Sequence, residues 1–194
     1  MTSSHELDSA AISHGDREGV YSLFSDPDFM YRTASPVVLD AHAIDRLLGD
    51  RTMVILHRGE AVGLWSFSSA FPLYSRHVPV YSGIYLLDYR LSSAAPSEWW
   101  TVGYQQILEF LGSKSDVVRV TMRVPEFDRL GQAAAVRMGL RFEGEIGQAL
   151  QWNGRSWANR VYGQVQPPDV FHDAVPGRFP GQSSRNDEGS CHGN

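Results

Sequence analysis

The sequence predicts a single α/β or α+β domain, in which one sheet is covered by helices on both faces. β-rich runs follow one another in the first half of the chain, and helix and strand patterns alternate in the second half. Strands in a meander followed by strand–helix–strand alternation are typical of such sheets. With 194 residues, 42% of them apolar, the chain can bury one sizeable core, so we expect one domain.

The first quarter of the chain predicts two short helices and an edge strand. A helix capped by Asp16 and ended before Pro27 would carry three apolar side chains, spaced three and four residues apart, on one face. Proline ends it because it disfavours helical geometry in the preceding residue. Residues 40–48 predict a second short helix, and the apolar positions of residues 7–12 are able to form a short edge strand.

The middle of the chain predicts three strands. Residues 52–57 and 61–67 are β-rich runs, and Arg58-Gly59-Glu60 between them is a hairpin signature. Residues 81–92 form a third run of aromatic and aliphatic residues, which we expect to be bent or bulged near its end. Strands that follow one another in this way predict a meander.

Helices and strands alternate in the second half. Residues 96–111 predict a helix, 117–124 a β-branched strand covered on both faces, and 129–138 an alanine-rich helix. Gly139 ends that helix, and two further strands follow, joined by the tight turn Asn153-Gly154. This order predicts strand–helix–strand units within the same sheet.

Both ends of the chain differ from this core in composition. Residues 1–6 are polar, and residues 166–194 are rich in proline, glycine and serine, without apolar periodicity. Such segments bury too little apolar surface to fold alone, so we expect both to be mostly disordered. The predicted domain therefore spans residues 7–165.

Composition argues against several classes of function. A net charge of -5 disfavours a nucleic-acid partner, because phosphate neutralisation needs clustered Lys and Arg. The single cysteine, Cys191, provides neither a disulfide framework nor a cysteine zinc site, which favours the reducing cytoplasm. There is no apolar run of about 18 residues and no secretion signal, so we expect neither a membrane protein nor export. The seven histidines lack ligand spacing, so we expect no metal.

Three segments carry a resemblance to a known family. The first is 16–33, where a helix is followed by Ser25-Asp26-Pro27-Asp28. The second is the hairpin that ends in Ala61-Val62-Gly63, and the third is 139–163 with its strand, turn and strand. The chain resembles the Gcn5-related N-acetyltransferases, and within them the branch that acetylates ribosomal proteins, over nearly everything outside the two ends.

The resemblance implies both a fold and a reaction. The fold would be a mixed, mostly antiparallel central sheet in which two parallel strands, 81–92 and 117–124, splay apart. Acetyl-CoA or another acyl thioester would be the co-substrate and would bind in that opening, where backbone N–H groups can polarise the thioester carbonyl. The acceptor would be a small-molecule or peptide amine, and the protein would be a monomer or a homodimer.

The family's phosphate-binding loop is altered in this chain. Its usual form is Gln/Arg-x-x-Gly-x-Gly/Ala, because small residues let the backbone approach phosphate oxygens. The matching positions are Glu98, Thr101 and Gly103, followed by Tyr104, so only one glycine remains and an acidic residue is added. The first candidate for the donor is acetyl-CoA, and the alternatives are a carrier-protein thioester or a loss of activity. The residues that the resemblance implies for donor binding are Leu91, Ser92, Trp100, Thr101, Gly103 and Tyr104.

The residue that would give a proton to the leaving thiolate also differs from the family pattern. Many members place a tyrosine on the helix before the last glycine, and the matching position here is Ala135. The asparagine that commonly opens that helix corresponds to Asp128. This carboxylate could hold the donor's amide or a water molecule, or it could be a plain helix N-cap.

Asp88 is our candidate for the general base that takes a proton from the acceptor amine. It lies in an otherwise apolar strand, where burial would raise its pKa toward neutrality. Alternatively, it points to solvent at the strand edge or pairs with Arg90 or Arg119. Glu143 is expected to face solvent or to pair with an arginine.

Aromatic residues concentrate where the acceptor would bind. The candidate acceptor contacts are Tyr74, His77, Tyr85 and Tyr89, which would indicate an apolar or aromatic acceptor or, alternatively, a subunit interface. Tyrosines that are four residues apart in one strand share a face only if no bulge intervenes. A histidine in a connection such as 74–79 more often has no special role.

The tryptophans favour structural interpretations. Trp99 and Trp100 could clamp an acyl chain, yet a pair at a helix start more often provides core packing plus one surface ring. The remaining three fall on predicted strands, where they are expected to fill sheet faces: Trp65, Trp152 and Trp157.

The leading functional hypothesis is an N-acyltransferase in which an amine attacks the thioester directly in a ternary complex. A competing hypothesis keeps the fold and makes the protein a ligand-binding or regulatory module. A third is a biosynthetic enzyme that has reused the same crevice for another reaction. The altered phosphate loop and the missing tyrosine are the features that favour the last two.

Overall fold

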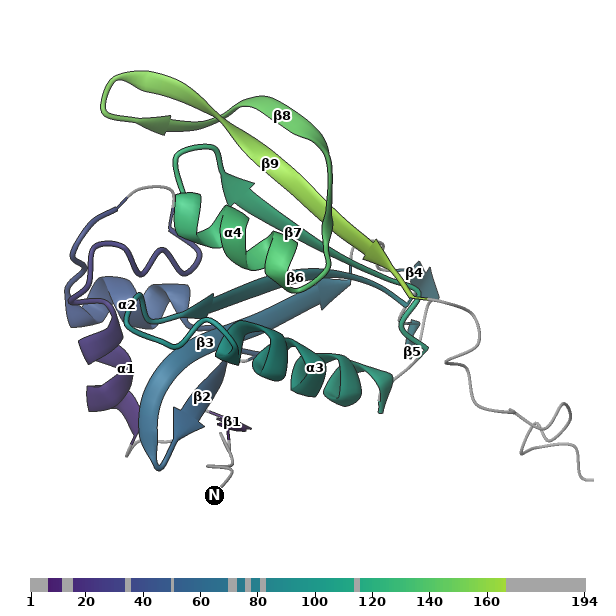
Figure 1. Ribbon diagram of the computed structural model, residues 1–194, viewed down its shortest axis with the longest axis horizontal. Coiled ribbons are helices and arrows are strands. Elements are labelled where there is room, and N and C mark those ends of the chain that lie inside the picture. Colours follow the sequence, from purple (N-terminus) through teal and green to yellow (C-terminus); the bar gives the residue numbers. More distant parts are fainter. Residues whose placement is uncertain are drawn as a thin grey trace, which may run out of the picture.

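The structure is a computed structural model that describes residues 7–11, 16–33, 36–49, 51–69, 73–75, 78–80, 83–113 and 116–166. Its main feature is a seven-stranded sheet with the strand order β1-β2-β3-β6-β7-β9-β8 (Figure 1). The strands of this sheet are β1 (Leu7–Ala11), β2 (Met53–His57), β3 (Glu60–Ser69), β6 (Ile84–Leu91), β7 (Arg119–Pro125), β8 (Arg141–Trp152) and β9 (Arg155–Val165). Two short strands, β4 (Leu73–Ser75) and β5 (Val78–Val80), form a separate ladder.

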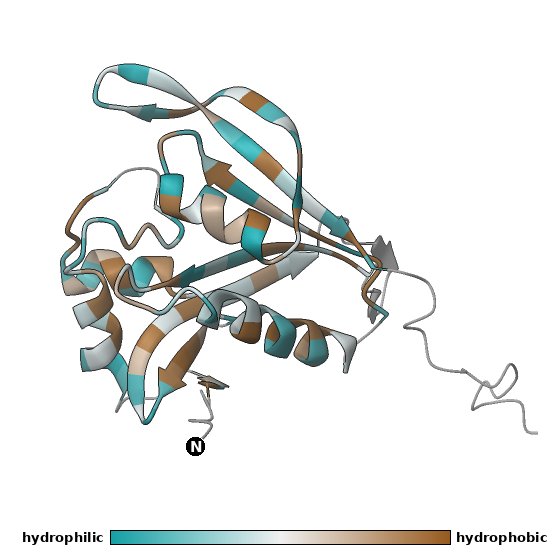
Figure 2. Ribbon diagram, viewed as in Figure 1, coloured by the Kyte–Doolittle hydropathy of each residue, from teal (hydrophilic) through white to brown (hydrophobic). Residues whose placement is uncertain are grey.

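Helices cover both faces of the sheet, as predicted. The helices are α1 (Arg17–Leu23), α2 (Ala41–Leu47), α3 (Trp99–Gly112) and α4 (Arg129–Arg137). The side chains of α1 and α2 pack in one hydrophobic cluster with Val54, whereas α3 and α4 pack in another with Ile55. Consecutive strand residues point to opposite faces, so these two clusters lie on the two sides of β2. Figure 2 shows hydrophobic residues on β2 and β3, between the helices.

Two tight turns confirm the predicted hairpins. Arg58 and Gly59 have φ values of 53° and 82°, and Asn153 and Gly154 have φ values of 51° and 70°. Positive φ at both central residues is what a two-residue type I′ turn requires, and its twist matches that of the flanking strands. These turns fix the registers of β2 with β3 and of β8 with β9.

Of the two helix caps that the sequence suggested, Asp128 is confirmed and Asp16 is not, while Asp40 is a further cap. The Asp40 side chain accepts a hydrogen bond from the Ala43 N–H at 2.7 Å, and Asp128 accepts one from the Gly131 N–H at 2.9 Å. Asp16 precedes α1 but makes no capping hydrogen bond, since its φ and ψ of -85° and -13° are helical rather than extended. The extended conformation is what directs a capping oxygen toward the first N–H groups.

The expectation that residues 117–124 form a strand covered on both faces was wrong. Val120, Met122 and Val124 of β7 are buried, but Arg123 on the other face is exposed. The charged side chains at alternate positions explain the difference, because an arginine is rarely buried without a partner. The second face of β7 therefore borders a hollow in the protein surface.

The parallel pair β6 and β7 splays apart, as the resemblance implied. The two strands pair only at Ile84 with Arg119, Tyr85 with Val120 and Leu86 with Thr121. Beyond this point β6 stays paired with β3 as far as Leu91, and β7 stays paired with β9 as far as Pro125. We call the opening between residues 87–91 of β6 and 122–125 of β7 the wedge. A cavity of the described structure lies there.

Candidate functional site

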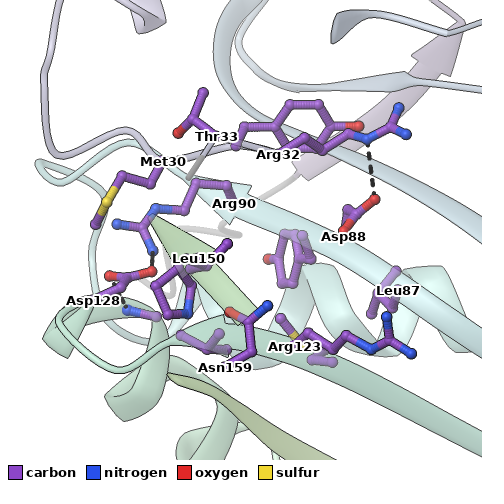
Figure 3. Close-up of a pocket in the computed structure, with 16 residues that line it drawn as sticks. Met30, Arg32, Thr33, Leu87, Asp88, Arg90, Arg123, Asp128, Leu150 and Asn159 are labelled. Carbon is purple, nitrogen blue, oxygen red and sulfur yellow. Dashed lines mark hydrogen bonds and ion pairs between the residues drawn. The ribbon is translucent and has the colours of Figure 1, made fainter. Parts of the chain in front are cut away.

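A cavity of about 230 Å³ opens at the wedge (Figure 3). Its walls come from the segment between α1 and α2, from both splayed strands, from the start of α4 and from the β8–β9 hairpin. The lining residues are Met30, Tyr31, Arg32, Thr33, Leu87, Asp88, Tyr89, Arg90, Met122, Arg123, Val124, Pro125, Asp128, Gly131, Leu150 and Asn159. Four parts of the chain that are separate in sequence therefore meet at the point where β6 and β7 separate.

Asp88 lies on β6 at this cavity, half-buried, with its side chain 41% exposed. Burial raises the pKa of Asp88 above its ordinary value, although Arg32, Ser66 and Arg123 each act to lower it. The Arg32 Nε atom lies 3.2 Å from the Asp88 Oδ2 atom (Figure 3). A carboxylate with a raised pKa at the mouth of a cavity can accept a proton from a bound amine.

The predicted pairing of Asp88 with Arg90 or Arg119 was wrong. The cation beside Asp88 is Arg32, whereas Arg119 forms an ion pair with Glu143 and Arg90 pairs with Asp128. Arg32 has a positive φ of 54° in the connection between α1 and α2. No local sequence pattern marks this contact, because its partners are 56 residues apart. The Arg119 pair does confirm the expectation for Glu143.

A hydrogen-bonded chain lies behind Asp88. The Ser66 hydroxyl donates to the Asp88 Oδ2 atom at 3.4 Å, and the Tyr31 hydroxyl donates to Ser66 Oγ at 2.8 Å. Tyr31 is only 1% exposed, and burial raises its pKa. Sequence reasoning missed both residues. The one available signal was a serine at a buried position of an otherwise apolar strand.

A buried ion pair spans the wedge. The Arg90 Nη1 atom donates to the Asp128 Oδ2 atom at 2.7 Å, and both side chains are 4% exposed. Arg90 also donates through Nη2 to the Asp28 carbonyl at 2.5 Å, while its buried Nε–H has no acceptor among the described residues. Because the other Asp128 oxygen caps α4, the N-cap interpretation of Asp128 is confirmed. Its role toward a donor stays a prediction.

Gly131 permits this close approach. A Cβ atom at Gly131 would lie 2.3 Å from the Asp128 Oδ2 atom and 2.9 Å from the Arg90 Nη1 atom. Both distances are shorter than real Cβ contacts, so only glycine leaves room for the ion pair at the first turn of α4. The arrangement holds α4 close to β6 across the wedge.

The residues expected to form a phosphate-binding loop lie inside α3. The helix begins at Trp99 with Glu98 at its N-cap, so Trp100, Thr101 and Gly103 belong to its first turns. The Thr101 and Val102 N–H groups both donate to the Glu98 carbonyl, at 3.1 and 3.2 Å. These N–H groups are engaged within the helix, which reduces what this helix end offers to a phosphate.

Gly103 faces the core. A Cβ atom at this position would lie 2.3 Å from the Tyr89 hydroxyl oxygen. That hydroxyl donates to the Trp99 carbonyl at 3.2 Å, so Tyr89 supports the first turn of α3. Helix-to-strand packing thus accounts for the glycine.

The other predicted donor and acceptor residues are divided between core and surface. Tyr85 packs against Phe67, with ring centroids 5.7 Å apart, and Tyr104 extends from α3 to bond Gln164 at 2.7 Å. Leu91 is buried and the Ser92 N–H donates to the Val62 carbonyl, whereas Thr101 is exposed. His77 and the side chain of Tyr74 lie outside the described residues. Of the two predicted acceptor contacts whose side chains the structure describes, Tyr89 lines the cavity and Tyr85 does not.

The tryptophans are structural, with one correction. Trp65 is fully buried in the core, and Trp152 and Trp157 pack on Phe127, as expected for residues that fill sheet faces. Trp99 and Trp100 are both buried, at 8% and 3% exposure, so the expected surface ring of that pair was wrong. The reason is that each ring has its own partner, His57 beside Trp99 and Tyr89 beside Trp100.

Two further properties concern the described part of the chain. Within it, no group of three or more His, Cys, Asp or Glu side chains is placed so that it could hold a metal ion. None of the helices in the described ranges is long and apolar enough to span a membrane.

No protein-family model matches the chain, and a search of curated proteins finds no match. Solved structures do match. The acetyltransferase from Salmonella typhimurium that modifies the N-terminal serine of ribosomal protein L7/L12 is 15% identical, with a TM-score of 0.68, and the match covers 84% of this chain and 97% of that one. A ribosomal L7/L12 alpha-N-protein acetyltransferase in complex with coenzyme A is 16% identical, with a TM-score of 0.66 and coverage of 84% and 95%.

A GNAT-family acetyltransferase from Bacillus anthracis is 15% identical, with a TM-score of 0.62 and coverage of 82% of this chain and 94% of that one. At such identities a structural match establishes the fold and leaves activity to be argued from the site. The seven-stranded mixed sheet, its single parallel pair and the helices on both faces agree with these neighbours. The chain therefore has the fold of the Gcn5-related N-acetyltransferases.

Proposed function

We propose that this protein is an acyltransferase that moves an acyl group from a thioester of the coenzyme A type to a primary amine. The observation that supports this most directly is the wedge, with a carboxylate of raised pKa at its mouth. Beyond Leu86, strand β6 has no partner on its β7 side. A slender thioester arm can pair there as an added strand, and backbone N–H groups can hold the carbonyl oxygen.

The residues of the cavity then have distinct parts in the reaction. Asp88 accepts a proton from the acceptor ammonium, and the freed amine attacks the acyl carbon. The carbon–nitrogen bond forms as the carbon–sulfur bond breaks, and the sulfur leaves as a thiolate. Asp128, at the start of α4, is a candidate contact for the donor's amide groups. Binding both reactants in one cavity supplies proximity without a covalent enzyme intermediate.

The start of α3 bears on the identity of the donor. The Thr101 and Val102 N–H groups donate to the Glu98 carbonyl, and Glu98 adds negative charge nearby. Phosphate groups therefore contribute less to donor binding than they would at a free helix end. A thioester of pantetheine alone is expected to bind nearly as well as acetyl-CoA, which also keeps a carrier-protein thioester open as the natural donor.

Donor binding can be measured by thermal unfolding. A ligand that binds only the folded protein stabilises it by RT ln(1 + [L]/Kd), about 2.7 kcal/mol at one hundred times Kd. We expect acetyl-CoA and acetyl-pantetheine to raise the melting temperature by similar amounts, and the Asp88→Asn variant to keep this response. No shift with either thioester at millimolar concentration would contradict the proposed function.

A second candidate is a ligand-binding module without transfer. It is favoured by Ala135, which occupies the position of the family's proton-donating tyrosine and is fully buried. The two functions separate in one assay. Thermal stabilisation by a thioester without release of free thiol, in the presence of any amine, would favour the binding module.

A further inference from the structure

The wedge cavity is more positive than the protein around it. Its lining contains three arginines, Arg32, Arg90 and Arg123, against two carboxylates, Asp88 and Asp128, which leaves one positive charge. The whole chain carries a net charge of -5. A positive cavity in an acidic protein favours a ligand that carries negative charge.

The excess charge can be assigned to one residue. Arg90 is paired with Asp128, and Arg32 is paired with Asp88. Arg123, from β7, is exposed at the cavity, and its side chain makes no hydrogen bond or ion pair with any residue that the structure describes. The charge of Arg123 acts on Asp88, since Arg123 is one of the cations that lower the pKa of that carboxylate. Figure 3 shows Asp88, Arg90 and Arg123 around the same hollow.

Arg123 has room for an anionic partner, because no described carboxylate forms an ion pair with it. A carboxylate suits the planar fork of arginine, which binds two oxygens at once.

We propose that the acceptor is a small amine that also carries a carboxylate, of the α-amino-acid class. Arg123 binds the carboxylate, and the amine lies at Asp88. This inference rests on the proposed function and names its substrate class. Asp88 and Arg123 then recognise the two ends of one zwitterion.

The test compares amino acids with their amides as acceptors. Each pair shares the amine and the side chain and differs only in the carboxylate. With acetyl-CoA as donor, thiol release should give a kcat/KM about 10- to 100-fold higher for the acid than for the amide. The Arg123→Gln variant should lose this preference, with the acid falling to the level of the amide. Arg123→Lys should restore part of it.

Arg155→Gln is the matched control, because Arg155 is an exposed arginine at the far end of the β8–β9 hairpin and outside the cavity lining. It should change neither rate. Equal rates for acid and amide in the unaltered protein would overturn the inference and leave the proposed function standing. An equal loss for both acceptors in Arg123→Gln would also overturn it. No transfer to any amine would refute the proposed function, and the inference with it.

Discussion

The carboxylate of Asp88 takes its properties from two other parts of the chain. Arg32 approaches it from the connection between α1 and α2, and Ser66 approaches it from β3. Both favour the charged form, yet burial outweighs them and the pKa of Asp88 is raised from its ordinary 3.8. A base of this kind is neutralised at a higher pH than a surface aspartate, so its titration should be visible in the reaction.

The acyl-transfer rate should fall as the pH is lowered through the raised pKa of Asp88, because the protonated carboxyl cannot accept a proton. Asp88→Asn should lower kcat/KM by about 10² to 10⁴ and remove this acidic limb. Arg32→Gln should move the limb to higher pH, since it removes a cation that favours the carboxylate. Asp116→Asn, at an exposed position, is the control. A pH–rate profile that Asp88→Asn leaves intact would exclude Asp88 as the base.

The same raised pKa has a consequence for stability. The folded protein holds the Asp88 proton up to a higher pH than the unfolded chain does. The contribution of Asp88 is therefore favourable below the ordinary pKa and is lost as the pH rises through the raised one. Asp88→Asn should consequently not destabilise the protein at neutral pH, which separates a loss of activity from a loss of folding.

At the level of elements, α3 sits directly on β6 because Gly103 has no side chain. The Tyr89 hydroxyl fills the space that a Cβ atom would need and bonds the Trp99 carbonyl. The opposite end of the same helix is open, since a Cβ atom at Gly112 would have no neighbour within 4 Å. The two glycines of α3 thus offer a matched comparison.

Gly103→Ala should destabilise the protein by about 1 to 3 kcal/mol, because the new methyl group overpacks the contact with Tyr89. Gly112→Ala should stabilise it by about 0.4 to 1 kcal/mol, since alanine restricts the unfolded chain and meets no obstacle. Urea unfolding measures both. Adding Tyr89→Phe should recover part of the loss in Gly103→Ala. If the two alanine variants were equally stable, the packing of α3 on Tyr89 would be refuted.

The elements were predictable where the signal was local. Arg58-Gly59 and Asn153-Gly154 identified two hairpins because their backbone requirement lies within two residues. The predicted helix over residues 96–111 also agrees with α3, which begins three residues later. The contact of Gly103 with Tyr89 was not predictable in this way, because Tyr89 comes from the preceding strand.

The candidate site was predictable only in part, for the same reason. Asp88 and Asp128 were identified from a polar residue in an apolar strand and from a helix start. Their partners were not, because Arg32 is 56 residues from Asp88 and Arg90 is 38 residues from Asp128. Contacts of that separation depend on how the sheet assembles.

For the molecule as a whole, the wedge interrupts an otherwise continuous sheet. Strand β7 is bonded to β9 along its full length, whereas β6 beyond Leu86 is bonded on its β3 side only. The two halves of the sheet are joined at three residue pairs and then by the Arg90–Asp128 ion pair. Backbone groups at the wedge are therefore available to a ligand.

Hydrogen exchange should reveal this availability. In the free protein, roughly every second amide of residues 87–91 should exchange quickly, because alternate amides of a strand point to opposite neighbours. The amides of β7 that face β9 serve as the protected reference. A bound thioester should slow the fast group and leave the reference unchanged. Uniform protection along 84–91 without ligand would contradict an open wedge.

The ion pair between Arg90 and Asp128 also limits how this sequence can change over generations. Loss of either residue alone would leave an uncompensated charge in the interior and destabilise the fold by about 3 to 5 kcal/mol. Replacement of both residues by a well-packed apolar pair can be tolerated. Lineages descended from this protein should therefore keep both residues or exchange both. A chain that carries only one of them would be a short-lived evolutionary intermediate.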